Sequence, residues 1–86
     1  MKESIIDYPC HFTIKVMGPN QDTFYQAVIT TIHNTYGALP SEKIRKKSSQ
    51  NKKYQSISLD LYAESQAQLD EIYRALNQVP NVLMIL

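Results

Sequence analysis

Two stretches of the chain alternate apolar and polar residues, as strands do when one face is buried. From position 10 to 17 every second residue is apolar: Cys10, Phe12, Ile14 and Val16. The stretch 54–63 repeats the pattern, with Ile57, Leu59 and Leu61 on one face and Ser56, Ser58 and Asp60 on the other. Because neighbouring side chains of a strand point to opposite faces, we expect each strand to have one face in a core and the other in water.

Helical spacing of apolar residues follows each of these strands. Apolar residues recur every three or four positions between about 21 and 36, and again after Ser65. Asn20 is predicted to cap the first helix, and Gly37 to end it. Ser65, with Gln68 three residues later, predicts a capping box at the start of the second helix.

Weaker patterns predict two further strands, at about 42–48 and at 82–86. Ile44 is the clearest anchor of the first, and the second is apolar on both faces. The resulting order, β-α-β-β-α-β, is typical of a ferredoxin-like α+β sandwich. We expect an antiparallel four-stranded sheet with strand order 4-1-3-2 and both helices on one face. Residues 8–86 then form a single domain, and residues 1–7 form a flexible N-terminal tail.

Several of these residues together resemble a known family. The motif Pro9-x-x-Phe12-x-x-Lys15-Val16-Met17-Gly18 is similar to the opening of the YbeD-like family of small bacterial proteins. The similarity continues at Ser48-Ser49, at Tyr54-x-Ser56-Ile57-Ser58 and at Val82-Leu83-Met84-Ile85-Leu86. The resemblance implies an ACT-like, ferredoxin-like fold and a cytoplasmic bacterial protein, but no particular activity.

The same resemblance draws attention to the turn after the first strand. In ACT regulatory domains this turn helps to bind an amino acid and commonly carries an Asp-x-Pro-Gly type pattern. Here it reads Met17-Gly18-Pro19-Asn20, which departs from that pattern. By analogy with the fold, we expect a regulatory module that binds a protein or a small ligand.

The composition narrows the classes of function. With 43% hydrophobic and 20% charged residues the chain is typical of a folded domain. No apolar run reaches the roughly 18–20 residues of a membrane span, so no membrane association is expected. Cys10 is the only cysteine, and its neighbour His11 points to the opposite face of the strand, which argues against a metal site or an activated thiol. We expect a non-enzymatic cytoplasmic protein without a cofactor.

The net charge of +1 hides a strong asymmetry. The segment 43–53 holds six of the nine basic side chains and no acidic one, which leaves a balance of −5 in the rest of the chain. These basic residues are Lys43, Arg45, Lys46, Lys47, Lys52 and Lys53. One interpretation is protection of an edge strand against aggregation. The alternative is binding of an anion or, weakly, of nucleic acid. Nucleic acid is the less favoured ligand, because the exposed face has aromatic residues only near the strand ends.

Two further surfaces are candidates for binding. Lys15, flanked by the hydroxyls of Ser56 and Ser58 and near Gly18 and Asn20, could hold a small anionic ligand. The alternative is a cross-strand pair of Lys15 with Asp60 on a solvated sheet.

The second surface is the apolar last strand, which should lie at a sheet edge. Its residues Val82, Leu83, Met84 and Ile85, with Met17 on the neighbouring strand, are predicted to contact a second copy of the chain or a protein partner. The alternative is that the N-terminal tail covers this strand through Ile5 and Ile6.

Overall fold

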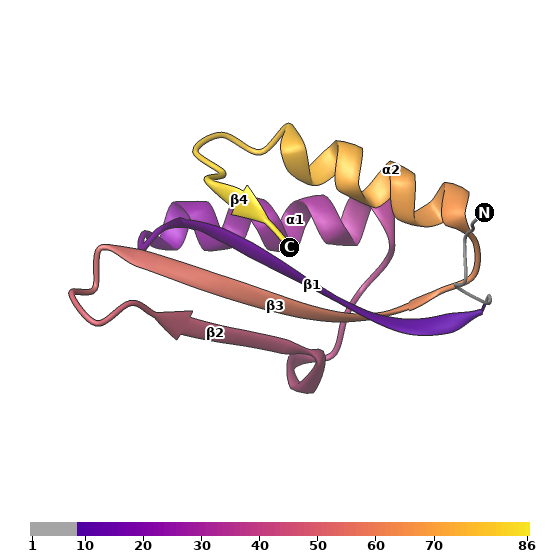
Figure 1. Ribbon diagram of the computed structural model, residues 1–86, viewed down its shortest axis with the longest axis horizontal. Helices are drawn as coiled ribbons and strands as arrows, with labels where there is room; N and C mark the ends of the chain where they lie inside the picture. The colour runs from indigo at the N-terminus through magenta and orange to yellow at the C-terminus, as the bar shows by residue number, and fades with distance from the viewer. Residues whose placement is uncertain (1–8) are drawn as a thin grey trace, which may run out of the picture.

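The computed structural model describes residues 9–86 and has the predicted order of elements (Figure 1). These elements are β1 (Cys10–Pro19), α1 (Asp22–Thr35), the 3-10 turn η1 (Ser41–Lys43), β2 (Ile44–Ser48), β3 (Tyr54–Ala63), α2 (Gln66–Asn77) and β4 (Met84–Ile85). The strands form one antiparallel sheet in the order β2-β3-β1-β4, which is the predicted order read from the other edge. The predicted tail 1–7, and its predicted contact through Ile5 and Ile6, lie outside the described residues.

The two central strands pair over their whole length, from Cys10 opposite Ala63 to Pro19 opposite Tyr54. This register places Ile14 opposite Leu59, so the apolar faces of both strands coincide. Both helices lie on that side of the sheet, as Figure 1 shows. The other side of the sheet is covered by neither helix, and we call it the open face.

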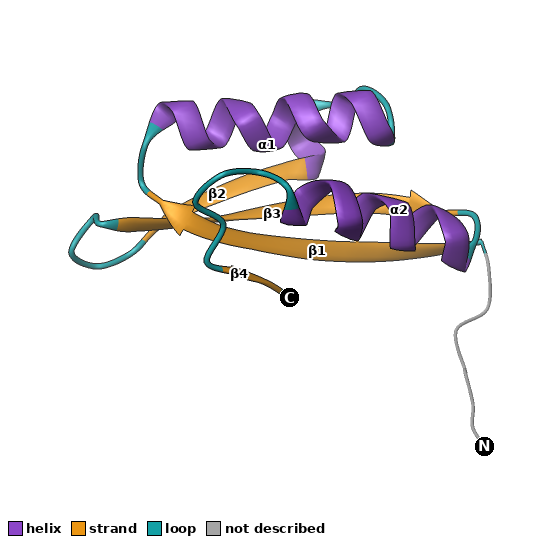
Figure 2. Cartoon of the chain, turned by 90° about the horizontal axis from the view of Figure 1, so that it is seen from above, coloured by secondary structure: helices purple, strands orange, loops and turns teal. Residues whose placement is uncertain are grey.

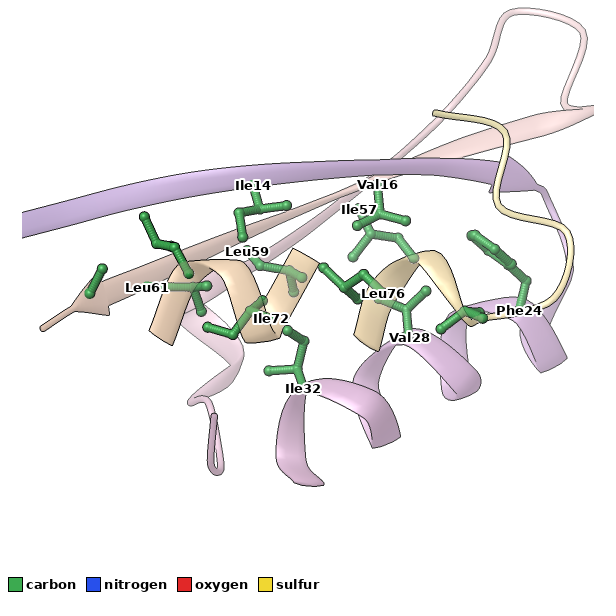
Figure 3. Close-up of a cluster of buried hydrophobic side chains, with 13 residues drawn as sticks. Ile14, Val16, Phe24, Val28, Ile32, Ile57, Leu59, Leu61, Ile72 and Leu76 are labelled. Carbon is green, nitrogen blue, oxygen red and sulfur yellow. The ribbon is translucent and has the colours of Figure 1, made fainter. Parts of the chain in front are cut away.

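The core fills the space between the sheet and the helices. The strands contribute fully buried residues such as Ile14, Val16, Ile57 and Leu59, and the helices contribute Val28, Ile32, Ile72 and Leu76. These side chains point toward one another in Figure 3. Burying each one stabilises the fold by about 1.5–3 kcal/mol. Phe12, at the end of the same face, is only partly buried, and its ring meets Tyr73 edge to face at 6.5 Å.

A buried polar side chain, Gln55, organises the turn from β1 into α1. Gln55 is 2% exposed, and its Nε2 donates hydrogen bonds to the carbonyl oxygens of Pro19 at 2.9 Å and Gln21 at 3.0 Å. Its Oε1 has no partner among residues 9–86. A side chain of β3 therefore holds the first residues of α1 in place, which the alternation of the strand did not indicate.

Gly18 is needed for packing. It continues β1 in an extended strand, where it pairs with Gln55. A Cβ atom at this position would overlap the ring of Phe24, the first buried residue of α1. The glycine therefore lets α1 approach the end of β1 closely, and the strand runs on to Pro19 rather than ending near 17 as predicted.

The cap predicted for the first helix is wrong. Gln21, not Asn20, occupies the N-cap position of α1, and its side chain makes no capping hydrogen bond. Asn20 instead donates from its amide side chain to the carbonyl oxygen of Lys52, which ties the turn to the β2–β3 loop. At the other end of α1, Gly37 has a positive φ of 132° and donates its N–H to Ile32, as expected of a C-terminal glycine.

The last strand is much shorter than predicted. β4 spans Met84–Ile85, and these residues pair with Met17 and Val16. In Figure 2 the chain leaves α2, turns back and places β4 beside β1. Asn81, with a positive φ of 73°, lies in the turn that allows this reversal. The pairing extends by two backbone hydrogen bonds between Lys15 and Leu86, of 3.0 and 2.8 Å.

Candidate functional site

The open face brings together polar side chains from the three longest strands. Lys15 of β1 stands opposite Ser58 of β3, and Ser58 stands opposite Arg45 of β2. The next row along the sheet is Met17, Ser56 and Lys47. The side chains of Lys15, Arg45 and Lys47 are exposed, so three cations surround two serine hydroxyls on this face.

The Lys15 amine makes no hydrogen bond or ion pair within residues 9–86, and neither do the hydroxyls of Ser56 and Ser58. The structure therefore brings these three predicted site residues onto one face, with Ser58 directly opposite Lys15 and Ser56 one row away. Gly18 and Asn20 do not join them. Gly18 is buried on the helix side of β1, and Asn20 is bonded to the β2–β3 loop.

The predicted alternative, a cross-strand pair of Lys15 with Asp60, is wrong. Asp60 stands opposite Thr13, whose hydroxyl donates to its Oδ1 at 2.8 Å. Arg45 binds the same carboxylate with two nitrogen atoms, Nη1 to Oδ2 at 2.5 Å and Nη2 to Oδ1 at 3.1 Å. The hydrogen bond from Arg45, followed by that from Thr13, holds the pKa of Asp60 below its usual value. The hydrogen bond to Asp60 likewise raises the pKa of Arg45.

A cavity of about 520 Å³ opens beside this ion pair, at the end of the sheet where η1 leads into β2. Arg45, Asp60 and Lys43 supply its charged lining, and Tyr36 and Tyr62 supply two aromatic rings. The hydroxyl of Tyr36 accepts a hydrogen bond from the backbone N–H of Tyr62 at 3.0 Å and donates to its carbonyl oxygen at 3.4 Å. The pairing of β2 with β3 begins at Leu59, so β2 does not pair with Tyr62. The Tyr36 hydroxyl binds the backbone of β3 where that strand partner is missing.

The sequence did not indicate this cavity. Tyr36 belongs to the end of α1 and Tyr62 to β3, and the two are 26 residues apart. The only signal available was that both are tyrosines at the predicted end of an element. Their meeting depends on how the loop after α1 returns to the sheet.

The six basic residues of the segment 43–53 are divided among four places. Arg45 and Lys47 lie on the open face, and Lys43 lines the cavity. Lys46 is on the helix side, where its Nζ lies 5.4 Å from the centre of the Tyr25 ring. Lys52 and Lys53 lie in the β2–β3 loop. The segment therefore does not present a single continuous cationic surface.

The predicted apolar interface is also divided. Leu83 and Met84 are 62% and 51% exposed, and Leu86 beside them is 62% exposed. Val82 and Ile85 instead pack partly against the core. Met17 is partly buried opposite Met84. An exposed apolar border of Leu83, Met84 and Leu86 therefore adjoins Lys15 at the edge of the open face.

We also searched residues 9–86 for a metal site, a reactive thiol and a membrane-spanning helix. No group of three or more His, Cys, Asp or Glu side chains there could hold a metal ion. Cys10 is a free thiol that packs at the margin of the core. None of the helices described is long and apolar enough to span a bilayer.

Comparison with known proteins gives a consistent result. The family model described as "Protein of unknown function (DUF493)" matches residues 3–86. The UPF0250 protein NE1487 of Nitrosomonas europaea is 38% identical over 85 residues, which cover 99% of this chain and 98% of that protein. The UPF0250 protein NMC1112 of Neisseria meningitidis is 35% identical over 85 residues, which cover 99% of this chain and 93% of that protein.

Two solution structures of the Helicobacter pylori protein HP0495 share the fold. One has a TM-score of 0.73 at 19% identity and covers 99% of this chain and 89% of that chain. The other has a TM-score of 0.61 at 21% identity and covers 100% of this chain and 95% of that chain. Neither the family description nor these names include a catalytic activity.

Proposed function

Because the chain belongs to the DUF493 family of small bacterial proteins of unknown function, we propose a function from its surface: it is a regulatory module that docks an acidic segment of a partner protein on its open face. The resemblance to the YbeD-like family is confirmed by this membership. The observation that carries the proposal is a sheet face that neither helix covers, where Lys15, Lys47 and the two serine hydroxyls have no partner among residues 9–86.

The open face carries more positive than negative charge. Among the described residues of the open face, Lys15, Arg45 and Lys47 outnumber the one carboxylate, Asp60, which Arg45 already binds. The helix side carries the exposed carboxylates Asp22, Asp70 and Glu71 together with the cations Arg74 and Lys46. A negatively charged partner is therefore attracted more strongly to the open face than to the helix side.

The open face also offers groups that suit a protein segment. The hydroxyls of Ser56 and Ser58 are available as donors between the cations, so they can bind carboxylates or backbone carbonyls. The exposed Met84 and Leu86 lie beside Lys15, which adds apolar area at one border. A segment that carries acidic residues next to apolar ones would match both parts of this surface.

A second copy of the chain was the other occupant predicted from the sequence. Two open faces that meet about a twofold axis would bring like charges together, because each face carries Lys15, Arg45 and Lys47. Such repulsion opposes a face-to-face homodimer. The charges therefore favour a partner of different sequence at this surface.

Binding of nucleic acid through the basic segment is the alternative function. A sheet that binds single-stranded RNA stacks bases on aromatic side chains at the middle of its central strands. Here the middle rows carry Lys15, Ser58 and Ser56, and the exposed Tyr54 and Tyr62 stand at the two ends of β3. Lys46 also points to the helix side. These positions support protein binding over base stacking.

The proposal is tested by charge reversal on the open face. The variant Lys15→Glu/Lys47→Glu is compared with the matched control Lys52→Glu/Lys53→Glu, which changes the charge equally in the β2–β3 loop. Each immobilised protein captures partners from a nuclease-treated extract of the native cell. Captured proteins are then identified, purified and titrated against each variant.

We expect at least one purified partner to bind the wild-type protein and the control variant alike. Its affinity for the open-face variant should fall about tenfold or more, and binding to the wild type should weaken as salt is raised. Equal binding by both variants would overturn the proposal. Partners that are captured from an untreated extract but not from the nuclease-treated extract would favour the nucleic-acid alternative instead.

A further inference from the structure

Apart from the partner surface, we propose that the cavity at the η1 end of the sheet is a separate site for a small organic anion, a monocarboxylate with an apolar or aromatic body. The cavity is lined by charged and aromatic side chains from β1, β2, β3 and the segment between α1 and β2. Its volume of about 520 Å³ lies within the roughly 300–1,000 Å³ typical of small-ligand sites.

The electrostatics of the cavity favour a single negative charge. Arg45 and Asp60 form an ion pair, so their charges largely cancel. Lys43 also lines the cavity, and its amine makes no hydrogen bond within residues 9–86, although its charge helps to lower the pKa of Asp60. The lining therefore carries one uncompensated positive charge, which a carboxylate would neutralise.

Hydrogen-bond donors remain available at the same place. The guanidinium of Arg45 has five N–H groups, and Asp60 accepts only two hydrogen bonds from it. A carboxylate placed between Lys43 and Arg45 could therefore accept from both without displacing Asp60. The Thr13 hydroxyl also donates to Oδ1 of Asp60, so the carboxylate of Asp60 has a further contact that holds it in place while a ligand is bound.

The remaining walls suit the body of such a ligand. The rings of His11 and Tyr62 are in edge-to-face contact, with centroids 5.0 Å apart and an angle of 62° between their planes. Apolar residues, among them Phe12, Leu39 and Pro40, also line the cavity. An aromatic or short aliphatic group would lose water against these walls while its carboxylate reaches Lys43.

Hydrogen bonds between Tyr36 and the backbone of Tyr62 fix one wall of the cavity. Both hydrogen bonds of the Tyr36 hydroxyl go to the backbone of Tyr62, so the wall formed by the α1–β2 connection is attached to the sheet. A ligand would therefore meet a site already formed, which reduces the entropic cost of binding.

The test uses benzoate and hexanoate as probes, with benzamide as the uncharged counterpart of benzoate. Two-dimensional NMR of the ¹⁵N-labelled full chain follows each titration. We expect saturable shifts of the amide signals of His11, Thr13, Tyr36 and Leu61, and weaker binding of benzamide.

Lys43→Met should weaken benzoate binding about tenfold, whereas Lys53→Met, the matched control in the β2–β3 loop, should leave the affinity unchanged. Tyr62→Ala, verified as folded by circular dichroism, should also weaken benzoate binding. Non-saturating shifts, or equal loss of affinity in the two lysine variants, would overturn the proposal. The open-face variant Lys15→Glu/Lys47→Glu changes neither Lys43 nor Tyr62. A negative result for benzoate binding therefore leaves the test of the partner surface unaffected, and the reverse also holds.

Discussion

Gly18, Asn20 and Gln55 meet where β1 leads into α1, and each makes a different contact there. Gly18 leaves room for the Phe24 ring, Gln55 binds two backbone carbonyls of the turn, and Asn20 holds the β2–β3 loop. None of these roles requires a ligand. The part of the chain where ACT domains bind an amino acid is therefore occupied here by contacts that stabilise the fold itself.

Replacing Gly18 by alanine tests this packing role. Because the added methyl group would overlap the Phe24 ring, Gly18→Ala should lower the free energy of unfolding by about 1–3 kcal/mol. Urea denaturation measures this change. The double variant Gly18→Ala/Phe24→Leu should lose less stability than the sum of the two single variants, since the smaller side chain relieves the overlap. Strict additivity would show that the two residues do not compete for space.

The Asp60 carboxylate should make stability depend on acid pH. Its pKa is lower in the folded state than in the unfolded chain, because Arg45 and Thr13 bind its charged form. The stabilising contribution is therefore complete above the unfolded pKa of about 3.9 and is lost as pH falls through the folded value. Arg45 remains charged across this range.

We accordingly expect wild-type stability to fall between about pH 5 and pH 2 more steeply than that of Asp60→Asn. Denaturation midpoints at several pH values give the comparison. Glu64→Gln serves as the control, because the Glu64 side chain makes no hydrogen bond in the part of the chain that is described. Parallel pH profiles for the wild type and Asp60→Asn would contradict the expected contribution of the ion pair.

At the scale of the elements, the two helices begin in different ways. The side chain of Ser65 accepts a hydrogen bond from the N–H of Gln68 at 3.1 Å, which confirms the predicted cap of α2. The side chain of Gln68 accepts from the N–H of Glu64 at 2.7 Å rather than from that of Ser65, so the second half of the predicted capping box is shifted by one residue. The first helix lacks such a cap, and its position depends on Gln55 and on the packing of Phe24.

This difference predicts opposite effects of cap substitutions. Gln21 is exposed and has the extended backbone of an N-cap, so Gln21→Asp should stabilise the protein by about 0.5–1 kcal/mol. Ser65→Ala removes an existing cap and should destabilise it by about 0.5–2 kcal/mol. Thermal and urea unfolding measure both effects, with Gln21→Ala as a control for side-chain loss. A destabilised Gln21→Asp protein would contradict the expectation that the N-cap position of α1 can accept a capping side chain.

At the scale of the whole molecule, the core lies on one side of the sheet only. The helix layer and the inner sheet face bury the core, and the outer face of the sheet is covered by neither helix. β4 pairs with only a short part of β1, so little of the stability can come from that edge. Core burial between β1, β3 and the two helices therefore carries the fold.

Truncation of one buried and one exposed leucine should separate these contributions. Leu59 is fully buried, so Leu59→Ala should cost about 2–5 kcal/mol, a large share of the roughly 5–15 kcal/mol available to a small domain. Leu83 is 62% exposed, and Leu83→Ala should change stability by less than about 0.5 kcal/mol. Urea denaturation measures both. A large effect of Leu83→Ala would mean that the apolar border is already covered in the isolated protein.

The sequence by itself determined the elements, their order and the buried face of each long strand. Alternation and helical spacing are local properties, and they follow from the geometry of a single strand or helix. The topology followed because the β-α-β-β-α-β order has few compact solutions. Ser65 and Gly37 were also predictable, because capping depends on residues a few positions apart.

Only the tertiary structure decided the partners of charged and polar residues. The sequence pointed to Lys15 as the partner of Asp60, but strand register placed Asp60 beside Thr13 and within reach of Arg45. The cavity beside them depends on the return of the α1–β2 connection, which joins Tyr36 to Tyr62. Register and loop closure bring together residues that are 15 to 47 positions apart, and no periodic pattern within one element encodes such distances.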